Sequence, residues 1–322
     1  MPRQVTRRFR GTTVIDNLRL KNVSGGPFDE IGRVYHINTE GAVYPGNDAN
    51  SGLEYEHPIA TITEALSRCV AGRNDYILVH DYWRPTDETW PIVHNKLKAH
   101  IVGVAQRGLP YPAIHPEDNV DAFQLSSSGQ YGSIEYLTIG GGAAAAGIEF
   151  GASGQVDGFI ISENIFGHRW FGTPLNGIRQ IVTDTRGGNG IVINRNHFLG
   201  DWQGKGSISG NAIDILCAAL NVYQLQILEN WFHGIDAVAI NLTRDNGGEI
   251  LDNRFTVPDG QTGEAITLRA ASLGTMVEGN RAMSGMLNAG YTYNPFRDLA
   301  VNTYNHWGMN YRGNSVIEPV GV

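Results

Sequence analysis

GIVINRNHFLG (residues 190–200) carries a pattern that returns further along the chain: an aliphatic residue, two variable residues, Asn, one more residue and Phe. LQILENWFHG (225–234) and GEILDNRFTVP (248–258) repeat it. When the Asn residues are aligned, the intervals are 32, 34, 23 and 27 residues, and the aligned positions are Asn164, Asn196, Asn230, Asn253 and Asn280. The pattern therefore indicates an internal repeat rather than an isolated turn.

A second short apolar segment precedes each Asn motif. These segments are AGIEF (146–150), NGIRQI (176–181), NAIDIL (211–216), VAINL (238–242) and EAITL (264–268). A weaker, earlier copy is DAFQL (121–125) with SIEYLTIG (133–140), in which we expect Thr138 at the Asn position. Short alternating segments bounded by Gly, Asn and Asp are typical of strands. The predicted unit is strand, turn, strand and Asn turn, and stacking of such units favours an all-β parallel solenoid.

Stacking assigns structural roles to the repeated residues. Equivalent positions of successive coils lie about 4.8 Å apart. We expect the Asn residues to adopt the left-handed conformation at one bend and to hydrogen bond along the axis. The residue two positions later should point inward, which predicts a ring stack of Phe166, Phe198, Phe232 and Phe255, followed by Ala282.

The segment RVYHINTEGAVYPGNDANSGLEYEHPIATITEALSRC (33–69) precedes the repeats. It looks like the N-terminal module of many β-helix proteins. Together with the repeats, over residues 33–285, the chain resembles right-handed parallel β-helix (pectin-lyase-like) proteins of phage virion type, such as capsid decorations and tail spikes. The resemblance implies a right-handed parallel β-helix with a short N-terminal capping helix. We expect that helix at about 61–70, with Ile62, Ala65, Leu66 and Cys69 on its inner face.

Three segments follow from this assignment. Residues 1–32 form an N-terminal arm, in which Arg3, Arg7, Arg8 and Arg10 are candidates for attachment to an acidic partner surface. Residues 33–285 form the β-helix with its N-terminal module. Residues 286–322 are rich in aromatic side chains and are predicted to be a C-terminal cap, a subunit interface or a sugar-stacking platform.

Composition excludes some classes of protein. The chain has 322 residues, 41 of them Gly, and a net charge of −8, which argues against a nucleic-acid binder. Cys69 and Cys217 lie far apart in sequence and are expected to be buried, reduced thiols. Residues 1–11 have no apolar stretch of the kind found in signal peptides, and no apolar run is long enough for a membrane span. We expect no cofactor, no metal and no membrane partner.

One column of residues could carry chemistry. The residues just before the ladder Asn should point outward, and they are Glu163, Arg195, Glu229, Asp252 and Gly279. Alternate members should lie about 10 Å apart, so Glu163 and Glu229 approach the spacing of an inverting glycosidase pair, with Arg195 between them. The alternative is an exposed row of ion pairs. A metal site formed by His168, His197, His233 and Asp201 is a minor alternative.

The functional prediction follows from the resemblance. The fold hosts lyases, hydrolases, esterases and non-catalytic viral proteins. The motifs Asn-Thr-Asp, Gly-His-Gly and Arg-Ile-Lys of β-helix pectinases do not occur in the sequence. The favoured prediction is a phage-like virion structural protein, made in the host cytoplasm and displayed on the particle as a capsid decoration or tail spike. It would be a homotrimer that contacts other virion proteins and binds glycans. The alternatives are a polysaccharide lyase or glycoside hydrolase, and a cellular adhesin.

Overall fold

The structure is a computed structural model, and part of the chain lies outside its description. The described residues are 32–321 with the exception of 40–41, 81–87, 105–110, 115, 117–119, 141–144, 151–153, 168–178, 184–186, 201–209, 218–220, 236, 258–263, 285–293, 301–303 and 313–314. The arginine-bearing arm, residues 1–31, and the side chains of His168 and Asp201 are thus outside the described residues.

Strands dominate the described chain, and they form three long sheets and one short sheet. Sheet A contains β1 (Val34–Ile37), β2 (Asp75–His80), β4 (Ala99–Val104), β7 (Ser133–Glu135), β11 (Ile160–Ser162), β15 (Val192–Asn194), β19 (Gln226–Leu228), β23 (Glu249–Leu251), β26 (Met276–Glu278) and β29 (His306–Trp307). Sheet B contains β3 (Ile92–His94), β6 (Phe123–Leu125), β9 (Ala146–Phe150), β13 (Arg179–Thr183), β17 (Ile213–Ile215), β21 (Val238–Leu242), β25 (Glu264–Leu268), β28 (Phe296–Asp298) and β32 (Val320–Gly321).

The other two sheets complete each coil. Sheet C contains β5 (Ala113–Ile114), β8 (Thr138–Ile139), β12 (Ile165–Phe166), β16 (His197–Leu199), β20 (Trp231–His233), β24 (Arg254–Val257), β27 (Arg281–Ser284), β30 (Asn310–Arg312) and β31 (Ser315–Ile317). The short sheet D contains β10 (Val156–Asp157), β14 (Gly188–Asn189), β18 (Val222–Tyr223) and β22 (Asp245–Asn246).

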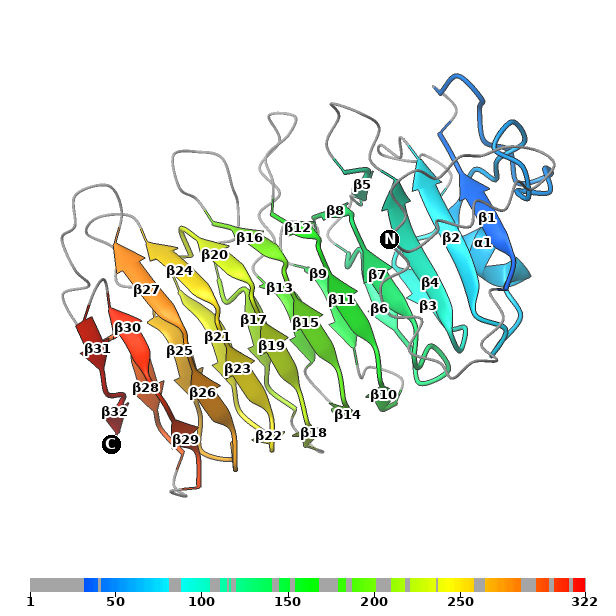
Figure 1. The fold of residues 1–322 in the computed structure, drawn as a ribbon. Coiled ribbons are helices and arrows are strands. Elements are labelled where there is room, and N and C mark those ends of the chain that lie inside the picture. The colour runs from blue at the N-terminus through cyan, green and yellow to red at the C-terminus, as the bar shows by residue number, and fades with distance from the viewer. Residues whose placement is uncertain are drawn as a thin grey trace, which may run out of the picture.

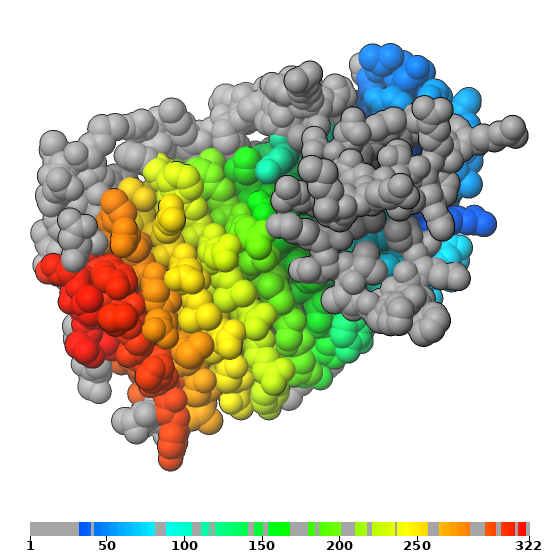
Figure 2. Space-filling model, viewed as in Figure 1, coloured from blue at the N-terminus to red at the C-terminus, as the bar shows by residue number. Residues whose placement is uncertain are grey.

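The strand order establishes a parallel β-helix. Within each long sheet the strands follow one another in chain order, and the pairing is parallel throughout except for β30 with β31. One coil runs from sheet B through sheet D and sheet A to sheet C, as β13, β14, β15 and β16 do (Figure 1). In the space-filling view, successive coils form adjacent slanted bands (Figure 2). The all-β prediction is confirmed, but the predicted unit of two strands was too short. The Phe of each motif begins or lies on a further strand, because the Asn turn is a bend between sheets A and C.

The aligned asparagines lie at that one bend and hydrogen bond in series. Asn196 shows the pattern: its Nδ2 donates to Asn230 Oδ1 at 3.1 Å and to the Ile161 carbonyl at 2.8 Å. Its Oδ1 accepts from the backbone N and Nδ2 of Asn164 at 3.0 and 3.1 Å. All ladder members are at most 1% exposed, so the amides satisfy buried backbone groups of neighbouring coils. The ladder continues to Asn310, which the sequence motif did not indicate.

Two expectations about this bend were wrong. The left-handed conformation belongs to the residue before each Asn, with φ of +56° at Glu163 and +52° at Arg195, and not to the Asn itself. In the early copy Leu137, rather than Thr138, occupies the ladder position, because its backbone N donates to Asn164 Oδ1 at 3.0 Å. Thr138 pairs with Ile165 on sheet C instead. The chain changes direction at the residue before each Asn, so the positive φ falls on that residue. The Asn side chain can then form hydrogen bonds along the axis of the β-helix.

The predicted ring stack fills the interior behind sheet C. Phe166, Phe198, Phe232 and Phe255 follow one another with centroid distances of 4.8, 4.7 and 4.9 Å and interplanar angles of 8° or less. Ala282 follows Phe255 in register. The rings are at most 2% exposed and belong to a continuous core of mainly aliphatic residues. Cys69 and Cys217 are buried members of this core, and burial raises the pKa of the Cys69 thiol to about 12.

The helix α1 (Ile62–Arg68) caps the N-terminal end, as expected. Ile62, Ala65, Leu66 and Cys69 are buried against the core. The Thr61 hydroxyl accepts from the Glu64 backbone N at 3.1 Å, which caps the helix. Glu88 adds a second cap, because its carboxylate accepts from the Ile62 backbone N at 2.7 Å.

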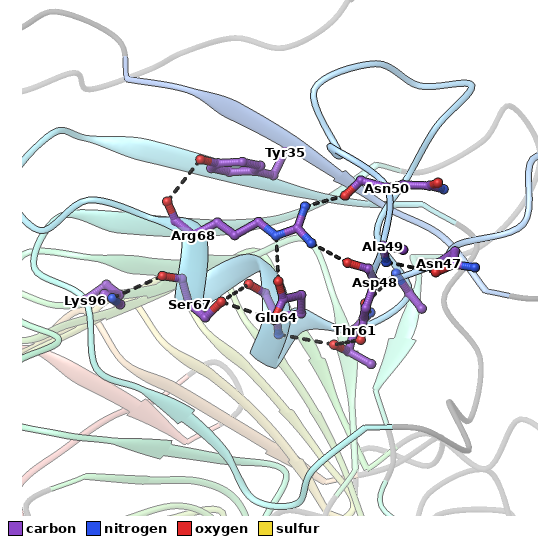
Figure 3. Close-up of polar contacts among 11 residues, drawn as sticks. Tyr35, Asn47, Asp48, Ala49, Asn50, Thr61, Glu64, Ser67, Arg68 and Lys96 are labelled. Atoms are coloured by element: carbon purple, nitrogen blue, oxygen red, sulfur yellow. Dashed lines mark hydrogen bonds and ion pairs between the residues drawn. The ribbon is translucent and has the colours of Figure 1, made fainter.

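The Asn-Asp-x-Asn loop is fastened to this helix (Figure 3). Asp48 accepts from the backbone N of Ala60 and Thr61 at 2.9 and 3.0 Å and from the Thr61 hydroxyl at 2.9 Å. The Arg68 guanidinium donates to the carbonyl oxygens of Asp48 and Asn50 from the other side. One carboxylate and one guanidinium thus fix the loop against the cap.

The C-terminal segment adds the last strands of the cylinder. β28 extends sheet B, β29 extends sheet A and β30 extends sheet C. Phe296 is fully buried, whereas Tyr304 is 73% exposed. The antiparallel β31 then pairs with β30 and finishes sheet C at this end. Tyr291 and Tyr293 lie outside the described residues.

Candidate functional site

The predicted outward column stands along the bend between sheets A and C. Glu163, Arg195, Glu229 and Asp252 share the left-handed conformation, so their side chains project from equivalent points of successive coils. Arg195 lies between the two glutamates: its Nη1 donates to Glu163 Oε1 at 3.1 Å and its Nε to Glu229 Oε2 at 3.0 Å. The side chains of Arg195, Glu163 and Glu229 are 46%, 29% and 59% exposed, respectively. The structure thus brings together all three candidate catalytic residues.

The contacts of this triad define what it can do. The hydrogen bonds that Arg195 donates to Glu163 and Glu229 raise the pKa of Arg195, so the guanidinium stays charged. Both carboxylates accept hydrogen bonds from Arg195, whereas a general acid donates a proton to the substrate. Exposed pairs of this kind contribute about 1 kcal/mol or less to stability. The triad by itself is therefore a row of surface ion pairs without a proton donor.

A further carboxylate beside the triad was missed from the sequence. Glu135 lies on β7, one coil before Glu163, and accepts from the Ser162 hydroxyl at 3.2 Å. Burial raises the pKa of Glu135, and the negative charge of Glu163 adds to the effect. Tyr136 and Tyr111 pack edge to face next to it, with ring centroids 5.8 Å apart. A carboxyl group whose pKa is raised, with a second carboxyl group nearby, is an arrangement that acid–base catalysis uses.

The outward face of sheet C carries a different row of side chains. His197, Trp231, Arg254, Arg281 and Tyr311 occupy one register position on β16, β20, β24, β27 and β30. The His197 and Trp231 rings are stacked at 4.8 Å and 13°. Arg281 lies over the Tyr311 ring at 5.4 Å. We call these five residues the sheet C row. The Asn-x-Phe motif contained the signal for the first four, since each of the five residues directly follows a ladder Asn, and Tyr311 follows Asn310, which lies outside the motif.

A buried histidine pair marks the N-terminal end of sheet A. His36 Nδ1 and His80 Nε2 are 2.9 Å apart, and Tyr55 packs edge-on against the His80 ring at 4.9 Å. Burial lowers the pKa of both histidines, that of His80 to about 4. One neutral ring donates and the other accepts, which joins β1 to β2, and Tyr55 packs edge-on against both rings. No sequence pattern indicated this contact.

No three His, Cys, Asp or Glu side chains in the described ranges gather closely enough to hold a metal ion. In the same ranges no helix is long and apolar enough to cross a membrane.

No protein-family model matches the chain, and no curated protein matches its sequence. Among solved structures, the crystal structure of the Dettilon tailspike protein (gp208) matches with 11% identity over 87% of this chain and 68% of that chain, with a TM-score of 0.26. The strand order, and not this score, establishes the fold of the present chain.

Proposed function

We propose that this chain is a phage-type virion protein whose β-helix is displayed on the particle surface, as a tail spike or a capsid decoration, and binds glycans. The observation that carries the proposal is a capped parallel β-helix with large aromatic and guanidinium groups exposed in register along one outward face. A long, ridged cylinder presents an extended surface to a polymer rather than a closed pocket for a small molecule. The N-terminal module, residues 33–69, supports the virion assignment through its resemblance to phage β-helix proteins.

Particle display can be tested directly. Antibodies against the purified chain should label the surface of native virions in electron micrographs, at tail fibres for a spike or over the shell for a decoration. Deletion of residues 1–32 should abolish incorporation into particles if the arginines of the arm bind an acidic virion surface. Normal loading of the truncated chain would place attachment elsewhere, most plausibly in residues 286–322. Absence of label from every particle would refute display.

Polysaccharide cleavage is a second candidate function, and Glu135 is the observation that favours it. Its raised pKa suits a general acid, and the neighbouring Glu163 could serve as the base, with Arg195 holding Glu163 in position. Glu135→Gln and Glu163→Gln should then each abolish cleavage while glycan binding persists. Glu229→Gln should have a smaller effect, since Glu229 lies on the far side of Arg195.

Cleavage is measured as release of reducing ends, or as ultraviolet absorbance of unsaturated products for a lyase. The double variant Glu163→Gln with Glu229→Gln tests the pair expected from sequence. Full activity of that double variant would exclude both carboxylates from catalysis. No product from any glycan bound by the wild-type chain would leave binding as the function.

A further inference from the structure

The sheet C row is built for contact with something outside the chain. In-register pairing places its five side chains at successive steps along the axis of the β-helix. Trp231, Arg254 and Arg281 are exposed, and His197 and Tyr311 are half-buried. The inward neighbours of His197, Trp231 and Arg254 on the same strands are the stacked Phe198, Phe232 and Phe255, so the row faces away from the interior. Its exposed aromatic and guanidinium groups therefore require another explanation than core packing.

Trp231 supplies an apolar surface that is held rigidly. Stacking on His197 and an edge contact with His233 at 5.7 Å fix the indole, yet 46% of Trp231 remains exposed. Contact between a large aromatic side chain and water is unfavourable. A ligand that covers the side chain therefore gains free energy on binding. Because its neighbours already restrict its rotamer, the indole would lose little side-chain entropy on binding.

Arg254 and Arg281 supply positive charge that no described residue neutralises. Neither forms an ion pair with a described carboxylate, in contrast to Arg195, which pairs with two. Arg281 is oriented by its position over the Tyr311 ring. A guanidinium binds a carboxylate through two parallel hydrogen bonds, so two such groups on adjacent coils fit an anion at successive positions.

The surroundings of the row restrict where an anion can lie. Glu229 and Asp252 stand on the adjacent bend and are exposed. Their charges would repel an anion placed over the bend and confine it to the sheet face. The chain as a whole carries a net charge of −8, so these two arginines are a local exception and not part of a general basic surface.

We infer that the outward face of sheet C binds an acidic polysaccharide along the axis of the β-helix, with Trp231 packed against a sugar ring and Arg254 and Arg281 bound to sugar carboxylates. The inference rests on the proposed glycan binding and names its site and its charge class. A linear polymer fits because the row presents one side chain on each coil, and successive coils are about 4.8 Å apart. The small number of cations disfavours nucleic acid, whose binding surfaces are far more basic.

The test uses the full chain and four polymers. Polygalacturonate and hyaluronate carry carboxylates on sugars, dextran is a neutral polysaccharide, and poly-L-glutamate carries carboxylates without sugars. Binding is measured by calorimetry and by retardation in gels containing each polymer. We expect binding of at least one of the two acidic polysaccharides, weaker binding of dextran and poly-L-glutamate, and loss of affinity at higher salt concentration.

Substitutions locate the site. Trp231→Ala and the double substitution Arg254→Gln with Arg281→Gln should each weaken binding by about tenfold or more, and Trp231→Phe should retain most of it. Tyr223→Ala removes an aromatic side chain that is 40% exposed on sheet D, and Arg33→Gln removes an exposed arginine at the N-terminal end. Both are matched controls and should bind as the wild-type chain does. Thermal unfolding of each variant shows whether the fold is intact.

The outcomes separate the inference from the proposed function. Unchanged affinity of the Trp231 and arginine variants, or no binding of either acidic polysaccharide, overturns the inference. Preferential binding of dextran overturns the charge class but leaves glycan binding in place. Binding of poly-L-glutamate that equals that of the acidic polysaccharides and is insensitive to Trp231→Ala overturns the sugar assignment. Surface labelling of virions is independent of all of these results.

Discussion

Asn196 and Asn194 offer a matched comparison on one strand and bend. The Asn196 side chain takes part in four hydrogen bonds with buried groups of neighbouring coils, whereas Asn194 is partly exposed on the outward face of sheet A. Asn196→Ala should lower the free energy of unfolding by about 2–4 kcal/mol, because several buried donors and acceptors lose their partner. Asn194→Ala should change it by less than about 0.5 kcal/mol. Urea unfolding measures both, and equal effects would contradict a special role for the ladder.

Asp245 is a buried acid whose charge the fold disfavours. It is fully buried on β22, and the Thr275 hydroxyl donates to its Oδ2 at 2.6 Å. Burial raises its pKa to about 6, above the value of 3.8 expected in the unfolded chain. A raised pKa means that the folded state binds the proton more tightly, so stability from this group is present at low pH and is lost as the pH rises through about 6.

Asp245→Asn should remove this pH dependence. Relative to the variant, the wild-type chain should gain about 1–2 kcal/mol of unfolding free energy when the pH falls from about 7.5 to about 5. The measurement is urea unfolding of both chains at the two pH values, and the difference between them cancels the titration of other groups. A difference that stays constant with pH would show that Asp245 is ionised throughout.

At the scale of the element, the ring stack behind sheet C should tolerate truncation poorly. Phe198 is fully buried between Phe166 and Phe232, at centroid distances of 4.8 and 4.7 Å. Phe198→Ala should cost about 3–5 kcal/mol, the usual range for a buried Phe, and Phe198→Leu should cost less because it leaves a smaller cavity. A loss under about 1 kcal/mol for the Ala variant, measured by urea unfolding, would mean that the coil collapses around the cavity.

The loop that joins the cap should depend on one carboxylate. Asp48 accepts three hydrogen bonds from Ala60 and Thr61, whereas the neighbouring Asn47 is exposed and its side chain accepts from the Ala49 backbone N within the loop itself. Asp48→Ala should increase amide hydrogen exchange in residues 46–68 and lower stability by about 1–3 kcal/mol. Asn47→Ala is the control and should leave exchange in α1 unchanged. Unaltered exchange in both variants would show that the loop does not depend on Asp48.

The repeated sequence motif predicted the structural elements that recur from coil to coil. Each copy of Ile-x-x-Asn-x-Phe samples the same position in a stacked coil, so the copies reinforce one another and the ladder, the ring stack and the strands before them could be placed. Asn310 escaped because Trp307 and Arg312 replace the aliphatic residue and the Phe around it. We assigned the positive φ to the Asn because, after Gly, Asn is the residue that tolerates it best. In the structure the positive φ falls on the residue before each ladder Asn.

The site was less predictable because its contacts cross between coils of unequal length. Arg195 could be placed between Glu163 and Glu229 from the repeat alone. Glu135 could not, since it belongs to the weak copy whose register was off by one residue at Thr138. The His36–His80 contact spans 44 residues and depends on the loop that carries Tyr55, for which no repeat exists.

At the scale of the whole molecule, we propose that the chain assembles as a homotrimer. A β-helix presents a flat face for each long sheet, and three copies can each use the same two surfaces and close around an axis. Light scattering should then give three times the chain mass of 35.1 kDa, unchanged on dilution through the micromolar range. A stable monomer under the same conditions would contradict closure in solution, and cross-linking on intact particles would show whether assembly requires the virion.

The Asn ladder also sets how the molecule yields to mechanical force. Each coil bonds only to the coil before it and the coil after it, so tension applied between the two chain ends loads one coil at a time. Pulling in an optical trap should peel coils from an end in steps of 23–34 residues, the intervals between successive ladder asparagines from Asn164 to Asn310. The unfolding force should be highest when the coils that carry Phe198 and Phe232 detach, because the amide ladder and the ring stack break together there. Such a cylinder unfolds gradually from its ends, one coil at a time, while the remaining coils keep their structure.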